Sequence, residues 1–294
     1  MKYLMAIAKS MRPVQWIKNL FVFAGLVFSQ EFFNLEKLLL SLAAFGVFCL
    51  LASGVYIFND IIDLPADRNH PTKKWRPIPS GQIPVWFASI FSIIFIGGGL
   101  LWAFHLKFGL GLIGATYILL QILYTLLLKN LVIVDILVVA SGFLLRAAAG
   151  AVILDVVVSS WLLLCTSLLA LFLVTAKRRQ EMARVVSQNS SFTRDVLKKY
   201  SLPFLDELLA VQAYGAMLSY AIYVFDPETA NRFGTNYLGI SLPFVIYGLF
   251  RYLYLVKVSG KGESPEKIVV SDVFIIINLL LWMISVIVII YFTK

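Results

Sequence analysis

Long apolar runs recur along the whole chain and constrain its fold more than any other feature. A helix needs about 20 apolar residues to cross the hydrocarbon core of a bilayer, and helices satisfy their own backbone hydrogen bonds there. The sequence therefore predicts an all-α polytopic membrane protein that forms a single integral membrane domain over residues 1–294. Nine spans are predicted: Trp16–Ser29, Leu38–Phe58, Val85–Phe104, Phe108–Leu128, Leu131–Leu154, Trp161–Ala176, Leu202–Phe225, Leu238–Val256 and Val273–Phe292.

The composition excludes two broad classes of protein. Hydrophobic residues make up 60% of the chain and charged residues 14%, and the mean hydropathy is +0.88. Soluble domains carry about 25% charged residues, so an ordinary water-soluble enzyme and a disordered protein are both excluded. Cys49 and Cys165 lie inside apolar runs, which indicates small buried side chains and not a disulfide framework or metal site.

The positive charges are distributed unequally between the two sides of the membrane. With nine spans, most of the 25 lysines and arginines fall on the side of the N-terminus. Cytoplasmic loops are normally enriched in these residues, so we expect a cell-membrane protein with its N-terminus and its charged loops in the cytoplasm. The bilayer thus accounts for the net charge of +9, and no nucleic-acid partner is expected. The opposite side carries only Lys37, Lys107, Arg232 and Lys294.

Three carboxylates follow the second predicted span. Asp60, Asp63 and Asp67 are spaced i, i+3 and i+7, which on a helix places them on one face. Like charges there repel unless a cation neutralises them, and oxygen-only ligands suit Mg²⁺. Pro65 disfavours a continuous helix, which makes Asp60 and Asp63 the stronger pair and Asp67 the weaker member. The alternative interpretation is a solvated acidic helix end.

A cationic loop comes directly after these acids. Lys73, Lys74 and Arg76 stand among prolines and glycine, where they could lie beside a metal-bound diphosphate. The guanidinium fork of arginine fits phosphate oxygens, so Arg76 is the strongest candidate. The charge bias of cytoplasmic loops explains Lys73 and Lys74 equally well.

The run N-D-x-x-D-x-x-x-D over Asn59–Asp67, followed by Arg76-Pro77 and Gly81, resembles the first signature of the UbiA-type prenyltransferase superfamily. The stretch Tyr124–Lys129 is similar to the end of the fourth span in that family. The resemblance implies nine helices around a central cavity, with the chemistry at its cytoplasmic mouth and a lateral opening for lipid.

The second acidic motif of that superfamily, D-x-x-x-D, is missing. Residues 175–181 read T-A-K-R-R-Q-E, with three cations and one acid. Together with Arg12–Asn19 and Leu145–Gly150, this resembles the decaprenyl-phosphate phosphoribosyltransferase branch. That resemblance implies a Mg²⁺-dependent enzyme of cell-wall biosynthesis that transfers 5-phosphoribose from phosphoribosyl diphosphate to a polyprenyl phosphate.

The resemblance assigns expected roles to individual residues. Asp60 and Asp63, supported by Asn59 and Asp67, would hold Mg²⁺ and neutralise the leaving diphosphate. Lys177, Arg178 and Lys18 would reduce the repulsion between the two anionic substrates, and Glu181 would orient Lys177 or bind a ribose hydroxyl. The expected catalytic residues are Asp60, Asp63 and Lys177; the expected metal ligands are Asp60, Asp63 and Asp67. The expected substrate-binding residues are Lys18, Asn59, Asp67, Lys73, Lys74, Arg76, Tyr124, Lys129, Arg146, Arg178 and Glu181.

Arg146 lies about 15 residues into its predicted span, where a charge is costly. We expect it to line the cavity and meet a substrate anion or a polar partner on another helix. A purely structural bond between helices explains it equally well. Arg179 is equally well explained by contact with lipid headgroups.

Two rival functions remain open at this point. One is a UbiA-type enzyme that joins a prenyl diphosphate to an aromatic or other acceptor, which predicts a second acid pair. The other is a lipid or anion transporter, which predicts paired halves and broken helices at mid-membrane. A homo-oligomer is also left open.

Overall fold

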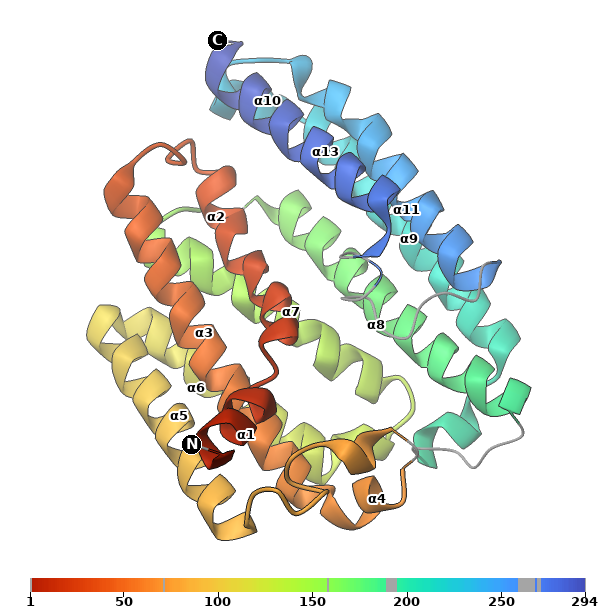
Figure 1. Cartoon of the computed structure of the whole chain (residues 1–294). Coiled ribbons are helices and arrows are strands. Elements are labelled where there is room, and N and C mark those ends of the chain that lie inside the picture. Colours follow the sequence, from red (N-terminus) through yellow and green to blue (C-terminus); the bar gives the residue numbers. More distant parts are fainter. Residues whose placement is uncertain are drawn as a thin grey trace. The chain divides into compact units, whose positions relative to one another are not determined.

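A computed structural model describes residues 2–70, 72–157, 159–188, 195–258, 268 and 271–293. Every regular element within these residues is a helix, as the sequence predicts (Figure 1). The chain divides into two compact units. Unit 1 comprises Met1–Val138 and Leu145–Val156, and unit 2 comprises Val139–Leu144 and Val157–Lys294. The single domain expected over residues 1–294 stays a prediction.

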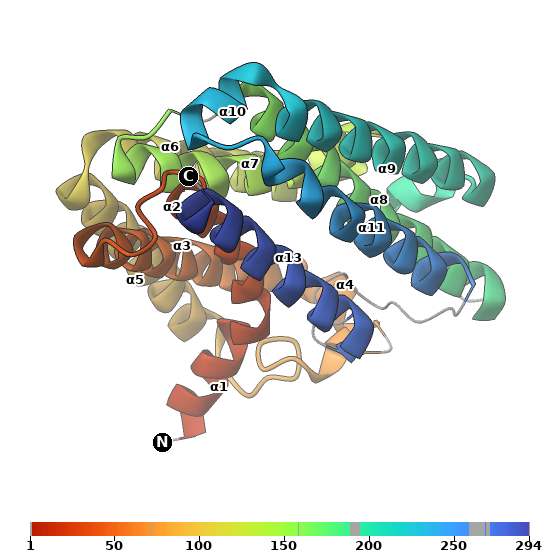
Figure 2. The same ribbon diagram turned by 90° about the horizontal axis from the view of Figure 1, so that it is seen from above.

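Unit 1 is built around one long helix. The central α3 (Leu35–Ile62) packs against the membrane helices α5 (Val85–Leu106) and α6 (Phe108–Leu126), and α3 and α5 lie side by side in Figures 1 and 2. Leu51 and Val55 of α3 and Leu110 of α6 are fully buried in the core. The remaining elements are α1 (Lys2–Ser10), η1 (Pro13–Phe23), α2 (Ala24–Val27), α4 (Leu64–Arg68), η2 (Lys73–Trp75), η3 (Leu128–Asn130) and most of α7 (Val134–Leu154).

Glycine permits a backbone-to-backbone crossing inside unit 1. A Cβ atom added to Gly150 of α7 would lie 1.8 Å from the carbonyl oxygen of Val22 in η1. A Cβ atom on Gly25 of α2 would lie 2.8 Å from the backbone of Gly150. Small residues allow such close approach between membrane helices. Any larger side chain at Gly150 would force η1 and α7 apart.

Unit 2 contains four long helices, α8 (Ser160–Gln188), α9 (Leu202–Phe225), α11 (Leu242–Lys257) and α13 (Val273–Phe292). Two buried hydroxyl groups and a partly buried indole join three of its elements. The Tyr220 hydroxyl lies 2.7 Å from Ser241 Oγ and accepts a hydrogen bond from Trp282 Nε1 at 3.0 Å. Polar groups of this kind hold membrane helices together. Shorter elements complete the unit: η4 (Asp195–Lys199), α10 (Pro227–Phe233) and η5 (Tyr237–Ser241).

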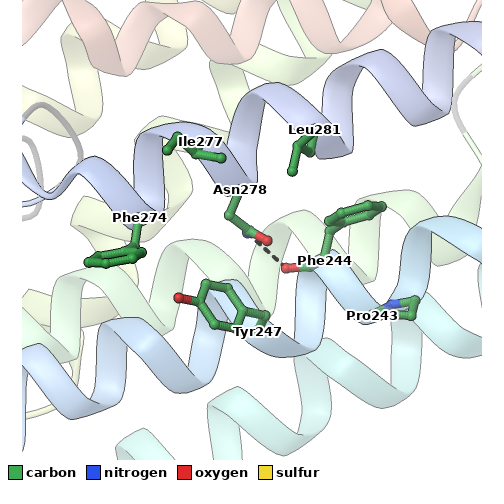
Figure 3. Close-up of a pocket in the computed structure, with 7 residues that line it drawn as sticks. All are labelled: Pro243, Phe244, Tyr247, Phe274, Ile277, Asn278 and Leu281. Atoms are coloured by element: carbon green, nitrogen blue, oxygen red, sulfur yellow. Dashed lines mark hydrogen bonds between the residues drawn. The ribbon is translucent and has the colours of Figure 1, made fainter.

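An apolar groove of about 360 Å³ lies between α11 and α13 (Figure 3). At its floor, Asn278 Nδ2 donates a hydrogen bond to the carbonyl oxygen of Phe244 at 2.9 Å. Gly248 leaves room for this amide, because a Cβ atom there would lie 2.9 Å from Asn278 Nδ2. The contact joins α13 to the first turn of α11, so we interpret the groove as part of helix packing.

Eight helices among the described residues are long and apolar enough to cross a membrane, and they correspond to the last eight predicted spans. The sixth is longer than predicted, because α8 continues to Gln188 and is not confined to Trp161–Ala176. The first predicted span, Trp16–Ser29, forms η1 and α2 instead, a shorter apolar stretch. At the rises of 3₁₀ and α helices these two elements extend roughly 28 Å, close to the hydrocarbon thickness. A ninth crossing and the central cavity stay predictions.

Candidate active site

The acid cluster lies at a joint between two helices. The helix α3 ends at Ile62, Asp63 occupies its C-cap, and α4 begins at Leu64 with Pro65 in its first turn. Proline is well tolerated there because no backbone N–H is needed. The expected interruption is thus confirmed, and it places Asp60 at the end of one helix and Asp67 in the next.

Asp60 and Asp67 are brought together by one arginine. Arg76 Nη1 donates hydrogen bonds to Asp60 Oδ1 and Asp67 Oδ2, each at 3.0 Å. Both aspartates are 2% exposed, so these are buried charges. Arg12 Nη2 also pairs with Asp60 Oδ1, and Lys73 Nζ lies 3.2 Å from Asp67 Oδ1. The loop cations and the acids therefore form one ion network.

Asp63 takes a different partner. Lys129 Nζ of η3 lies 2.6 Å from Asp63 Oδ1, and both side chains are partly exposed. In the last turn of α3, Asn59 Oδ1 accepts a hydrogen bond from Thr125 Oγ1 of α6 at 2.5 Å. Tyr124 is buried beside Thr125 in α6. The end of α6 is thus attached to the end of α3 through two polar contacts.

Arg12 is a member of this network that the sequence analysis did not place in the site. Its backbone is left-handed, with φ 54° and ψ 63°, which is uncommon for residues other than glycine. Ser53 Oγ of α3 lies 3.3 Å from the carbonyl oxygen of Met11 and accepts a hydrogen bond from Trp16 Nε1 at 3.2 Å. The only signal in the sequence was the motif Arg12–Asn19, which carries no information about the partner of Arg12.

The electrostatics of the network are unbalanced. Among the described residues, Arg12, Lys73 and Arg76 pair with the two carboxylates of Asp60 and Asp67, while Lys129 pairs separately with Asp63. Burial, followed by repulsion from Arg12, lowers the pKa of Arg76 despite its two carboxylate partners. An anion added beside these cations would relieve that repulsion.

The buried carboxylates leave one oxygen that a divalent cation could bind. Asp60 Oδ2 is buried and has no hydrogen-bond partner among the described residues, so a carboxylate oxygen is available to a metal. In the same described residues, no three His, Cys, Asp or Glu side chains gather within reach of one ion. The residues therefore fit a cation that takes one or two carboxylates and completes its shell with substrate oxygens, as Mg²⁺ does.

Arg146 lies deep in unit 1 and is 5% exposed. Its Nε donates to Asn19 Oδ1 at 2.6 Å and its Nη2 to the Tyr117 hydroxyl at 3.1 Å. Its guanidinium also lies 4.9 Å from the centre of the Tyr117 ring. Asn19 belongs to η1 and Tyr117 to α6, so Arg146 meets polar partners on other helices, which fits the structural bond between helices equally well. A role of Arg146 toward a substrate stays a prediction.

Two other predicted lysines have local partners. Lys18 Nζ donates to Gln15 Oε1 at 2.5 Å within η1. Lys74 Nζ lies 5.2 Å from the centre of the exposed Trp75 ring. Neither contact involves the carboxylates of the joint, so any role of these lysines toward a substrate stays a prediction.

Residues 175–181, the basic stretch where the superfamily has its second acidic motif, lie on α8 in unit 2. Arg178 is 2% exposed and donates from Nη1 to Glu181 Oε2 at 3.1 Å, one helical turn later. Lys177, the expected catalytic lysine, is half-buried. Arg179 pairs with Asp206 of α9 at 3.2 Å and donates to the carbonyl oxygen of Val256 at 3.0 Å, so its role within unit 2 is to join helices.

Comparison with known proteins gives consistent results over nearly the whole chain. The model of the UbiA prenyltransferase family matches residues 19–276. Decaprenyl-phosphate phosphoribosyltransferase of Mycolicibacterium smegmatis is 33% identical to this chain, over 97% of the chain and 92% of the relative. The protein of the same name from Mycobacterium tuberculosis H37Rv is 32% identical, over 95% and 92%.

Solved structures show the same fold. The structure of a UbiA homolog from Archaeoglobus fulgidus, bound to DMAPP and Mg²⁺, superimposes with a TM-score of 0.72 at 18% identity. The alignment covers 96% of this chain and 98% of that one. The helices and the apolar spans thus have the architecture of a multi-pass membrane enzyme. The chain belongs to the UbiA prenyltransferase family.

Proposed function

We propose that this protein transfers 5-phosphoribose from phosphoribosyl diphosphate to a polyprenyl phosphate of the decaprenyl type, a step toward arabinose donors for cell-wall polysaccharide. The observation that carries the proposal is the near full-length similarity to relatives with that name, at 33% and 32% identity. The basic stretch Lys177–Arg179, where a second acid pair would serve a prenyl diphosphate, supports the same conclusion.

In this reaction the bond between the anomeric carbon of ribose and its diphosphate oxygen breaks, and the diphosphate leaves with the electron pair. An oxygen of the lipid phosphate forms the new bond to that carbon. The difficulty is charge, because the leaving group becomes more negative and the nucleophile is itself an anion. Arg12, Lys73, Arg76 and Lys129 supply four cations that would bind the departing diphosphate.

A divalent cation, proposed to be Mg²⁺, would neutralise negative charge on the leaving diphosphate. One or two of Asp60, Asp63 and Asp67 are the proposed ligands, with Asn59 in support. Asp60 is the best supported of them, because its Oδ2 is buried without a partner among the described residues. Asp67 follows, since it shares Arg76 with Asp60.

The acceptor phosphate needs positive charge but little help from a base. We propose that Lys177 and Arg178 bind anionic groups of the substrates and position the attacking oxygen. The carboxylate of Glu181 holds the buried guanidinium of Arg178 in one orientation. Lys18, Lys74, Tyr124 and Arg146 are proposed as further substrate-binding residues, and Arg146 would act through its contacts with Asn19 and Tyr117.

The orientation in the membrane is also proposed. The concentration of Lys and Arg on one side supports a cell-membrane enzyme with the N-terminus and the reactive loops in the cytoplasm. A cysteine introduced at Lys9, on the exposed side of α1, should react with a charged thiol reagent only when the cytoplasmic face is accessible.

The function is tested with purified protein in nanodiscs, supplied with phosphoribosyl diphosphate labelled in the ribose, Mg²⁺ and a polyprenyl phosphate. Transfer yields a labelled lipid that partitions into organic solvent. Chelation of the metal should stop the reaction, and Asp60→Asn should abolish it. Asp155→Asn is the matched control, because Asp155 is an exposed aspartate that pairs with Lys107.

A second reaction mixture distinguishes the rival enzyme. It contains a prenyl diphosphate and an aromatic acid in place of the ribose donor and the lipid phosphate. Product in this mixture alone would replace the proposed function with prenyl transfer. Label in the lipid fraction of the first mixture alone supports phosphoribosyl transfer.

A further inference from the structure

We propose that α1 is an interfacial helix that lies on the surface of the lipid bilayer, with Leu4, Met5 and Ala8 directed toward the acyl chains. The proposal concerns Lys2–Ser10, which takes no part in the reaction described above. Three features of the helix support it: its two different faces, its contact with a membrane span and the position of its lysine.

The two faces of α1 have opposite environments. Ala6, Ile7 and Ser10 are buried, and the first two pack in a small apolar cluster with residues such as Ile57 of α3. Leu4 and Met5 are 63% and 61% exposed. Burial of the inner face fixes the rotation of the helix, so the exposure of two large apolar side chains is a property of the fold.

The N-terminal end of α1 lies against the first turn of α5. The Tyr3 ring lies 5.7 Å from the ring of Phe87 in the first turn of α5. Trp86 beside it is 65% exposed, and Ile93, one to two turns further into the span, is 70% exposed. Since α5 is long and apolar enough to cross the membrane, these contacts place α1 beside one end of a membrane span.

The polar edge of α1 also fits a bilayer surface. At about 100° per residue, Leu4, Ala8 and Met5 follow one another around the helix and Lys9 comes next to Met5. This arrangement places an ammonium group at the border of an apolar strip, where it can reach lipid phosphates. Trp75 is also exposed, with Lys74 Nζ against its ring, and tryptophan is enriched at membrane interfaces.

The position of α1 has a consequence for the ion network. Ser10 ends the helix, and only Met11 separates it from Arg12, whose guanidinium pairs with Asp60. A helix held at the bilayer surface would therefore fix the direction from which Arg12 approaches the carboxylate.

The test measures the depth of single nitroxide labels in nanodiscs. Cysteines replace Leu4, Met5, Ala6 and Lys9 one at a time, and the unsubstituted protein gives the background from its two native cysteines. Collision rates with oxygen, which concentrates in lipid, are compared with those of a water-soluble nickel chelate. Ile93→Cys provides the lipid reference and Glu228→Cys the aqueous reference, because both residues are exposed.

We expect labels at Leu4 and Met5 to resemble the Ile93 reference, the label at Lys9 to lie between the references, and the label at Ala6 to be shielded from both reagents. An aqueous profile at Leu4 and Met5 would overturn the proposal. So would shielding of both positions with spin–spin broadening, which would show that a second copy of the chain covers α1. Equal collision rates at all four positions would show that the segment is not an amphipathic helix and would also overturn the proposal.

Discussion

Two arginines, Arg76 in unit 1 and Arg251 in unit 2, show how differently ion pairs are used in this protein. Arg251 of α11 donates to Asp272 through two nitrogens, at 2.9 and 3.3 Å, and Asp272 also caps α13 by accepting from the backbone of Ile275. Every charge there has a matching partner. Arg76 instead shares one nitrogen between two buried carboxylates and lies beside a second guanidinium.

The difference supports the proposal that Arg251 forms a structural ion pair and that the charges around Arg76 bind a ligand. Around Arg251 the ion pair lowers the pKa of Asp272, as expected for a satisfied carboxylate. Around Arg76 burial lowers the pKa of the arginine itself, and a carboxylate oxygen of Asp60 has no partner among the described residues. Imbalance of this kind costs stability and is retained where chemistry needs it.

The sharpest way to break the comparison is to make the same substitution in both regions. Asp60→Asn should reduce phosphoribosyl transfer at least about 100-fold, because a charged group that stabilises the transition state is lost. Asp272→Asn should leave kcat/KM within about twofold, since the amide oxygen can still cap α13. The measurement is the rate of transfer over a range of substrate concentrations, which gives kcat/KM, alongside the unfolding temperature of each variant. Equal losses in both would show that the two clusters do the same work.

The next prediction concerns competition for Asp60. Arg12→Gln removes one of the two cations that pair with Asp60 Oδ1. We expect Mn²⁺ alone to bind at least about threefold more tightly to this variant than to the unsubstituted protein, and diphosphate alone to bind more weakly. Titration calorimetry measures both affinities without turnover. Arg251→Gln should change neither, and a lower Mn²⁺ affinity in Arg12→Gln would contradict the proposed competition.

A separate effect, on diphosphate binding, is expected at Lys129, whose ammonium lies 2.6 Å from Asp63. Lys129→Gln should raise the concentration of diphosphate needed for half-saturation about tenfold, the effect of one charge-assisted hydrogen bond. Lys257→Gln is the matched control, because Lys257 pairs with Asp206 in unit 2 at 3.1 Å. An unchanged affinity in Lys129→Gln would remove this lysine from the proposed diphosphate site.

The smallest effect is a pH dependence in unit 2. The hydrogen bond from Arg251 lowers the pKa of Asp272, so the folded state favours the ionised carboxylate. The stability that this adds is present above the unfolded pKa of about 3.9 and is lost as the pH falls below it. The unfolding temperature of the unsubstituted protein should therefore fall more steeply below about pH 4 than that of Asp272→Asn. Parallel curves would show that this ion pair adds no stability.

The sequence predicted the membrane helices well because hydropathy and length decide them locally. Leu202–Phe225 and Val273–Phe292 have the predicted bounds, since Ser201 and Asp272 cap their first turns. The helix α8 exceeded its predicted span because residues beyond Ala176 remain helical after the apolar run ends. The 3₁₀ winding of η1 was not predicted, because it is an uncommon geometry over such a length.

Partners within the site were harder to predict than its members. The three aspartates and Arg76 were proposed as site residues from their spacing and charge, yet which acid meets which cation depends on how α4 and the loop after it fold back. Asp67 was expected to be the weaker member and is as deeply buried as Asp60. Arg12 was missed because its approach to α3 depends on a left-handed residue, which no periodic pattern reveals.

The backbone at Arg12 has a consequence for how the chain can change. A glycine or asparagine would adopt φ 54° with less strain. A substitution that relieves this backbone strain therefore also removes the guanidinium group of Arg12. Selection for thermal stability would therefore favour glycine or asparagine at residue 12, and selection for turnover would favour arginine. A library selected for heat resistance alone should become enriched in substitutions at residue 12, and these variants should transfer phosphoribose more slowly.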